Sequence, residues 1–237
     1  MSKPALLITV ALLSAAVLVT TSAAQDPGGT VMSGEASVTP NKAGTKRKPQ
    51  GVRIAGKVHW ETPPGVERPV ITGAKVLFPK GALYNGRKYP KCSLATLARR
   101  PTPRACPAGS IMGKGSGVAF ADTVLTRPKI TVINGGAKEV CLFTLLQYPA
   151  RIQTCVAGRI RKLSGKWAYE LTLTVPRILQ VVAGVPIQLR DFEFSAGSPK
   201  KDWLATTGCS GGRWPFEITA FYSTGGSATY RDSLPCR

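Results

Sequence analysis

The stretch VAGRIRKLSGKWAYELTLTV, residues 156–175, consists of two runs of alternating residues around a short polar turn. In the second run, Leu171, Leu173 and Val175 are two positions apart, which places them on one face of a strand. A Ser-Gly pair at 164–165 joins the runs, and such a pair is typical of a hairpin turn. The stretch therefore predicts an antiparallel hairpin with one apolar face.

The same pattern recurs along most of the chain. Further strand-like runs are VRIAGKVHW (52–60), GAKVLF (73–78), GVAFAD (117–122), KITVING (129–135), VCLFTLLQY (140–148), VPIQLRDFEF (185–194) and FEITAFYSTGGSATYRDSLP (216–235), the last with a Gly-Gly turn. No helical stripe exceeds about two turns, and one short helical turn is expected near 93–100. About nine short strands separated by turn signals predict an all-β fold, an antiparallel β-sandwich that is immunoglobulin-like or related.

The N-terminal residues divide into two expected segments before this domain. Residues 1–24 contain Lys3, an apolar run of about 15 residues and a small-residue cleavage site, which predicts a secretory signal peptide rather than a membrane span of about 20 residues. Residues 25–50 are rich in Gly, Ser, Thr, Pro and Lys, so a disordered basic linker is expected there. Residues 51–237 are then a single disulfide-stapled domain.

The charge of the chain indicates its partners. The net charge of +20 falls only to +19 when Lys3 is removed with the signal peptide. A basic protein outside the cytoplasm attracts anionic cell-wall polymers, acidic polysaccharide or a membrane surface. Nucleic acid is not expected for an exported chain. The expected location is secreted and extracellular, with association to the cell wall, and the expected state is a monomer.

The six cysteines indicate structural disulfides. All six follow the signal peptide, and an even number in an exported chain is typical of disulfide bonding. Six cysteines allow many pairings, of which local spacing favours Cys92–Cys106, Cys141–Cys155 and Cys209–Cys236. The chain lacks C-x-x-C and has one histidine, which disfavours a redox pair or a zinc site. No metal and no cofactor are expected.

Three motifs carry a resemblance to known proteins. They are LFPKGALYNGRKYPKCSLATL (77–97), ACPAGSIMGKGSGVA (105–119) and CSGGRWPFEITAFY (209–222), followed by a terminal cysteine. In this respect the chain resembles a group of secreted proteins from high-GC Gram-positive bacteria over about residues 70–237. The resemblance implies an exported, disulfide-bearing β-domain and brings no activity with it.

Two sets of residues are catalytic candidates. The GCSGG motif and the chain order His59, Asp122, Ser210 match the order in trypsin-like proteases, although a cysteine replaces the acid before Ser210 and a triad is defined by geometry rather than order. Asp191 and Glu193 share one face of a strand about 7 Å apart, a spacing that inverting glycosidases use. Their alternation with phenylalanines is also the ordinary pattern of a half-buried strand.

Two further features of the sequence are candidate binding sites. GSIMGKGSG (109–117) departs from the spacing of phosphate-binding loops, so its glycines are expected to serve turns with positive φ. Aromatic residues with basic neighbours provide a platform that can stack on sugars, but the favoured interpretation is that these aromatics cap the core. The binding candidates are Trp203, Trp214, Tyr84, Arg87, Lys88, Lys200 and Lys201.

These observations favour a secreted, non-enzymatic protein that binds at the cell envelope. The charge, the export signal and the lack of a convincing catalytic constellation support this hypothesis. The alternative is a hydrolase that acts on wall polysaccharide or peptide, with a site at the edge of the sheet.

Overall fold

A computed structural model describes residues 24–25 and 29–237 of the chain. The predicted signal peptide, apart from Ala24, lies outside the described residues. Neither helix in the described part has the length and apolar character needed to cross a membrane.

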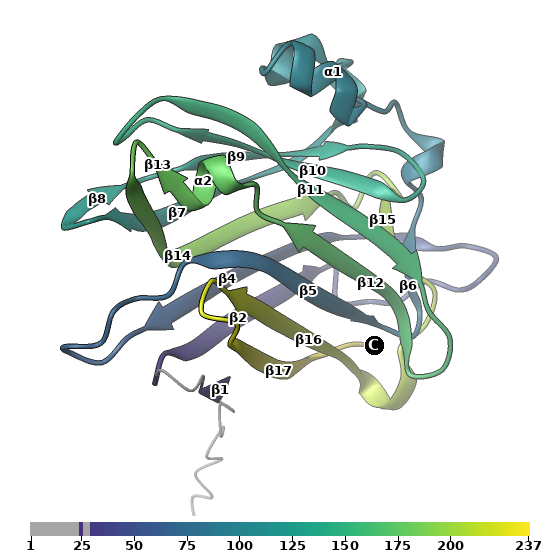
Figure 1. The fold of residues 1–237 in the computed structure, drawn as a ribbon. Coiled ribbons are helices and arrows are strands. Elements are labelled where there is room, and N and C mark those ends of the chain that lie inside the picture. Colours follow the sequence, from purple (N-terminus) through teal and green to yellow (C-terminus); the bar gives the residue numbers. More distant parts are fainter. Residues whose placement is uncertain (1–23, 26–28) are drawn as a thin grey trace, which may run out of the picture.

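Most of the described chain forms one antiparallel sheet (Figure 1). Its strands in sheet order are β1 (Ala24–Gln25), β2 (Val31–Thr39), β4 (Arg53–Glu61), β14 (Val185–Gly197), β7 (Ile111–Ala121), β9 (Lys129–Asn134), β10 (Glu139–Leu146), β11 (Ile152–Lys162), β12 (Trp167–Thr174), β5 (Ile71–Pro79), β16 (Arg213–Tyr222) and β17 (Ser227–Pro235). Two short strands pair outside this order: β8 (Val124–Thr126) with β7, and β13 (Val181–Val182) with β14.

The remaining elements are short. A second sheet contains β3 (Gln50–Gly51), β15 (Leu204–Thr206) and β6 (Ala82–Tyr84). The helices are α1 (Leu94–Arg99) and α2 (Arg177–Gln180), with single turns η1 (Gly86–Lys88), η2 (Pro103–Ala105), η3 (Ala108–Ser110) and η4 (Ser210–Gly212). Helix α1 begins where predicted, because the Ser93 hydroxyl accepts a hydrogen bond from the backbone N–H of Thr96 at 3.1 Å.

The large sheet curls until its two ends face each other. Gly34 on β2 is so close to β17 that a Cβ atom there would lie 3.3 Å from the ring of Tyr230. The predicted all-β antiparallel class is confirmed, and the two layers expected of a sandwich belong to one continuous sheet. The hairpin read from residues 156–175 is also confirmed as β11 and β12, which pair from Ala157↔Thr174 to Lys162↔Tyr169.

All three predicted disulfides are present: Cys92–Cys106, Cys141–Cys155 and Cys209–Cys236. The first closes the loop that contains α1, which packs on the outside of the sheet (Figure 1). Leu97 of α1 is buried there against Ile133 and Phe143. The second disulfide joins neighbouring strands β10 and β11, and the third ties η4 to the end of the chain.

Two expectations from the sequence are wrong. Residues 25–50 are not a linker throughout, because residues 31–39 form strand β2, which pairs with β4 along its whole length and fully buries Met32. The glycines of the 109–117 motif do not have positive φ. Gly113, Gly115 and Gly117 lie within strand β7, where a Cβ atom at Gly115 would approach the Glu193 carbonyl on β14.

Candidate functional site

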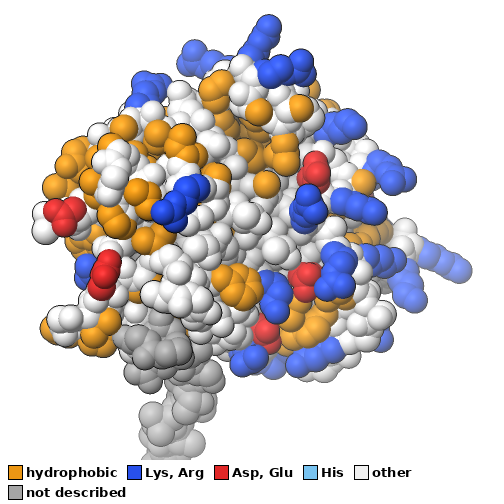
Figure 2. Space-filling view, in the orientation of Figure 1, with side chains coloured by type: hydrophobic (Ala, Val, Ile, Leu, Met, Phe, Trp, Pro, Cys, Tyr) orange, Lys and Arg blue, Asp and Glu red, His pale blue; other side chains and the backbone are white. Residues whose placement is uncertain are grey.

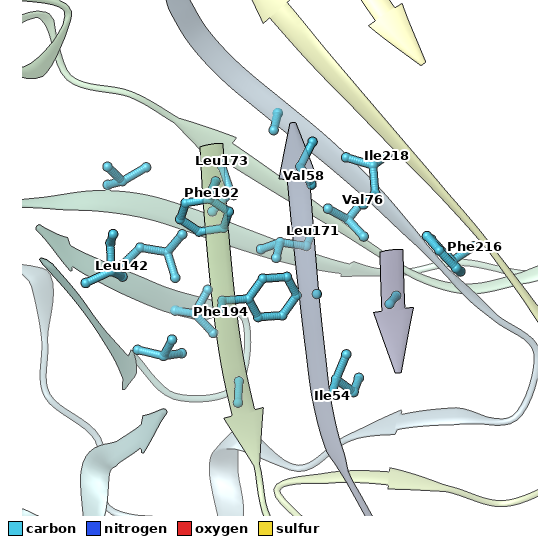
Figure 3. Close-up of a pocket in the computed structure, with 18 of the residues that line it drawn as sticks. Ile54, Val58, Val76, Leu142, Leu171, Leu173, Phe192, Phe194, Phe216 and Ile218 are labelled. Atoms are coloured by element: carbon cyan, nitrogen blue, oxygen red, sulfur yellow. The ribbon is translucent and has the colours of Figure 1, made fainter. Parts of the chain in front are cut away.

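The inner face of the curled sheet encloses an apolar cavity of about 360 Å³ (Figure 3). Alternation supplies its walls, because every second side chain of a strand points inward. Leu171 and Leu173 of β12 face it, as the sequence pattern predicts. Further walls come from other strands: Ile54 and Val58 (β4), Val76 (β5), Leu142 (β10), Phe192 and Phe194 (β14), and Phe216 and Ile218 (β16).

A change of register in strand β14 directs apolar side chains on both sides of it into the cavity. Its pairing with β7 shifts between Leu189 and Asp191, which is the mark of a β-bulge. Leu189 before the bulge and Phe192 and Phe194 after it therefore all line the cavity. Gly56 on β4 leaves room for the Phe194 ring, since a Cβ atom there would lie 2.9 Å from it.

The lining offers few polar groups. Among the described residues that line the cavity, Glu35 is the one that carries a charge, and its side chain is exposed on the surface. Two buried polar atoms on lining residues, Nε1 of Trp60 and Oγ1 of Thr206, have no hydrogen-bond partner among the described residues. The cavity is therefore suited to apolar molecules.

The protease-like candidates are not joined by hydrogen bonds. Ser210 is exposed in η4, and Asp122 is exposed in the turn between β7 and β8, where it has φ of 57°. Within the described part of the chain, neither bonds to His59. The His59 Nδ1 atom instead lies 2.6 Å from Oδ1 of Asp191 on the neighbouring strand. The sheet register therefore places Asp191, and not Asp122, beside His59.

The two candidate carboxylates on β14 point to the outer face of the sheet. Partial burial raises the pKa of Asp191, but hydrogen bonds from His59 and Arg190 outweigh this and hold the pKa below its usual value. Glu193 accepts a hydrogen bond of 2.6 Å from the Ser116 hydroxyl. A glycosidase acid must be protonated, and these contacts keep Asp191 ionised.

An open hollow on the same face holds a second pair of carboxylates. Glu35 on β2 and Glu193 on β14 flank Lys57, which lies opposite both in the strand register. Lys57 therefore lies between the two carboxylates in the strand register.

Two of the expected stacking aromatics are in the core. Trp203 and Trp214 are only 2% and 3% exposed, so neither forms a stacking platform, and the favoured interpretation that these aromatics cap the core holds for both. Their indole N–H groups are satisfied inside, by Oδ1 of Asn134 at 3.1 Å and by the Gly208 carbonyl at 2.9 Å. Tyr84 lies edge-on to Trp203 and donates to Asn134, which gives it a structural role.

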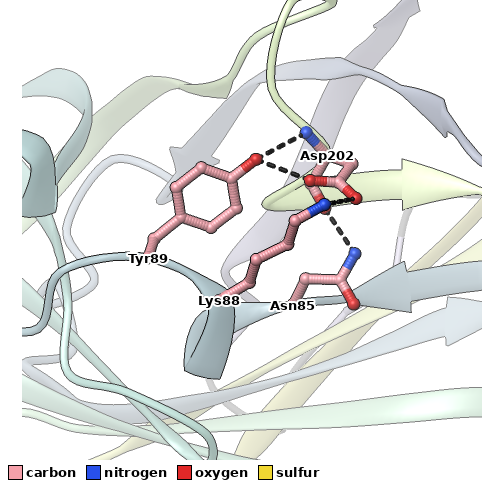
Figure 4. A network of polar contacts seen from close by, with 4 residues as sticks. All are labelled: Asn85, Lys88, Tyr89 and Asp202. Atoms are coloured by element: carbon pink, nitrogen blue, oxygen red, sulfur yellow. Dashed lines mark hydrogen bonds and ion pairs between the residues drawn. The ribbon is translucent and has the colours of Figure 1, made fainter.

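The basic candidates form two groups. Lys88 belongs to a fixed network in which Asp202 accepts hydrogen bonds from Lys88 Nζ at 2.7 Å and from the Tyr89 hydroxyl at 2.6 Å (Figure 4). Asn85 donates to the Asp202 carbonyl and completes the network. The other candidates, Arg87, Lys200 and Lys201, are exposed surface cations.

The exposed cations are unevenly distributed. No Asp or Glu occurs between Asn85 and Ala121, a segment that contains the disulfide loop 92–106. This loop carries three exposed arginines, Arg99, Arg100 and Arg104. Figure 2 shows Lys and Arg side chains over the α1 end and along the right-hand edge, with few acidic side chains among them.

Comparison with known protein-family models finds no match, and no curated protein matches the chain. Among the described residues, no group of three or more His, Cys, Asp or Glu side chains is placed to hold a metal ion. The cavity is the feature that reasoning from the sequence missed. The alternating pattern of the strands does indicate many apolar faces directed inward. It does not show whether those faces pack against one another or enclose a space.

Proposed function

We propose that this chain is an exported, non-enzymatic binding protein that encloses an apolar small molecule in its central cavity. The cavity volume of about 360 Å³ is the observation that carries the proposal. Sites for small molecules typically measure roughly 300–1,000 Å³ and are mostly apolar. The three disulfides support export, since such bonds are typical of oxidising compartments.

The energetics of the cavity favour an occupant. Cavities in cores cost about 24 cal/mol per Å³ in lost contacts, so an apolar ligand that filled 360 Å³ would recover on the order of 9 kcal/mol. Loss of the ligand's translational and rotational freedom offsets part of this gain. That cost is roughly 4–15 kcal/mol, so the net affinity depends on how completely the ligand fills the cavity.

Titration with Nile red, a neutral apolar dye, tests this proposal. We expect saturable fluorescence enhancement with one dye per chain, competed by long-chain alcohols. Val76→Phe places a larger side chain in the cavity and should weaken binding at least tenfold. Val124→Phe makes the same change at an exposed position on β8 and should leave binding unchanged. Equal dye binding by both variants would place the dye on the surface and refute the proposal.

We further propose that the basic exterior holds the protein at anionic polymers of the cell wall. The disulfide loop 92–106 is the leading contact, because Cys92–Cys106 fixes a loop with three exposed arginines and no acidic residue. Pre-ordered cations bind polyanions with less loss of conformational entropy than mobile ones. Attraction of this kind weakens with ionic strength.

Retention on purified cell wall across a salt series tests the second proposal. Replacing Arg99, Arg100 and Arg104 by glutamine should reduce retention more than the same change at Arg159, Lys162 and Lys166, which alters net charge equally. Retention that does not respond to salt, or equal losses in both variants, would count against the loop. Retention on anionic phospholipid vesicles but not on wall would identify a lipid surface as the partner instead.

A further inference from the structure

The two ends of the large sheet lie side by side without being paired. In sheet order β2 and β17 stand at opposite ends, apart from the short β1, which pairs only with Val31 and Met32 of β2. The curl of the sheet brings them together, because a Cβ atom at Gly34 would lie 3.3 Å from the Tyr230 ring (Figure 1). Among the described residues, no backbone hydrogen bond joins β2 to β17. The wall of the cavity therefore contains a join that side chains alone make.

This join is fastened beyond its far end. The backbone N–H of Ala43 donates to the Arg237 carbonyl at 2.6 Å, and that of Arg237 donates to the Asn41 carbonyl at 3.0 Å. Together with the contact at Tyr230, these bonds show that β2 and β17 run in the same direction. We call the unpaired stretch the seam; it comprises residues 33–39 and 229–235.

The cavity lies directly behind the seam. Ala36 and Val38 of β2 and Leu234 of β17 line the cavity, so both sides of the seam form part of its wall. Glu35, whose side chain is exposed on the outer face, lines the cavity as well. The cavity therefore approaches the surface at the seam.

The rest of the wall is closed more firmly. Every other pair of neighbouring strands in the large sheet is joined by a ladder of backbone hydrogen bonds, and β16 pairs with β17 along most of its length. Each such bond contributes about 0.5–1.5 kcal/mol, so separating a paired edge costs several of them. The two open ends of the curled sheet are covered, one by the small sheet through Leu204 and the other by α2 through Leu179. Separating the seam breaks no ladder.

We propose that the seam is the route by which ligands enter and leave the cavity. The two strands separate there when the Tyr230 ring moves away from Gly34, while β1 and the bonds to Arg237 hold the strands together at either end. Glycine and alanine at positions 34 and 36 leave little side chain on β2 to obstruct the passage. This inference rests on the proposed function and adds the path to the site.

A chemical link across the seam tests the inference. Ser37→Cys with Ser233→Cys places one thiol on each side, and a short bismaleimide joins the two thiols in the folded protein. The six native cysteines are all in disulfides and do not react. We expect the link to slow both association and dissociation of Nile red at least about tenfold in stopped-flow measurements, because binding then lacks the conformational change it needs. Since both rates fall together, Kd should stay within about twofold of the unlinked variant.

A link between strands that hydrogen bonds already join is the matched control. Glu217→Cys with Arg231→Cys provides it, because these residues are direct neighbours on β16 and β17. This link should leave both rates unchanged. Thr39→Cys with Pro235→Cys gives a second link across the seam, which repeats the test if the first pair of substitutions impairs folding.

The outcomes separate the route from the site. Unchanged rates in the protein linked across the seam, equal slowing by the control link, or a loss of affinity in place of an equal fall in both rates would overturn the inference and leave the proposed function standing. Absence of saturable dye binding by the unlinked protein would refute the proposed function itself.

Discussion

At the scale of the residue, the Asn134 side chain makes hydrogen bonds to several segments that are distant in sequence, and no sequence pattern predicts these contacts. It is fully buried at the end of β9, and its Nδ2 atom donates to the carbonyls of Gly86 and Pro90. Its Oδ1 atom accepts from Tyr84 and from Trp203. One side chain thereby fixes the segment after β6, the start of the disulfide loop and the turn before β15.

Asn134→Ala should lower the free energy of unfolding by about 3 kcal/mol or more. The substitution leaves several buried polar groups unpaired, and each costs about 1–3 kcal/mol. Lys129→Ala, an exposed change on the same strand, should alter stability by less than about 0.5 kcal/mol. Chemical denaturation of both variants provides the comparison, and a loss at Asn134 no larger than at Lys129 would remove its central role.

Asp202 predicts an acid-dependent part of the stability. Hydrogen bonds from Lys88 and Tyr89 hold its pKa below the usual value near 3.8. A depressed folded-state pKa means that the contribution is complete above about pH 4 and is lost as the pH falls through the folded pKa. The melting temperature of the wild type should therefore fall between about pH 4 and 2 more steeply than that of Asp202→Asn. Parallel curves would show that this carboxylate does not contribute.

The buried tryptophans show a limit of reading residues from their neighbours. Trp203 follows Lys200, Lys201 and Asp202, and this polar context makes its indole ring a candidate for an exposed stacking platform. The charged neighbours do lie at the surface, while the indole turns inward to reach Asn134. Because that partner is 69 residues away in sequence, local context could not reveal it.

At the scale of the element, β2 was hidden by its small residues. Met32, Gly34, Ala36 and Val38 alternate with polar residues, as a half-buried strand requires. Glycine and alanine weaken that signal, yet they are needed here because β17 lies close. A Cβ atom at Gly34 would also lie 3.1 Å from the Lys57 carbonyl.

A chain that begins at residue 51 should be far less stable than one that begins at residue 29. The shorter chain lacks β2, which leaves one edge of β4 unpaired and exposes Trp60 and Tyr230. The loss should be a large part of the roughly 5–15 kcal/mol that stabilises a typical domain. Thermal unfolding of the two chains measures it. Equal melting temperatures would restore the interpretation of residues 25–50 as a linker.

The three disulfide pairings could be predicted because each joins cysteines that are close in sequence, and local spacing favours such pairings over the others. Replacing Cys92 and Cys106 together by serine should cost roughly 2–4 kcal/mol, since the constraint on a loop of about 15 residues is lost from the unfolded chain. Denaturant midpoints of the double variant and the oxidised wild type give the value. A free thiol detected in the denatured wild type would contradict the pairing.

At the scale of the whole molecule, the fold class followed from the sequence but the cavity did not. Alternation in stretches such as residues 156–175 identifies strands and their inner faces. Whether Leu171 meets Phe194 directly or across a space depends on how far the sheet curls and on the bulge in β14. Both are set by contacts between strands distant in sequence.

The central claim is that the interior of the sheet is a binding site, and isothermal titration calorimetry with the long-chain alcohol hexadecanol tests it most directly. Burial of an apolar chain in the cavity should give one site per chain and a negative heat-capacity change of binding. Val76→Phe should weaken or abolish the signal, and Val124→Phe should preserve it. Absence of binding by the wild type, or a heat-capacity change near zero, would contradict the account.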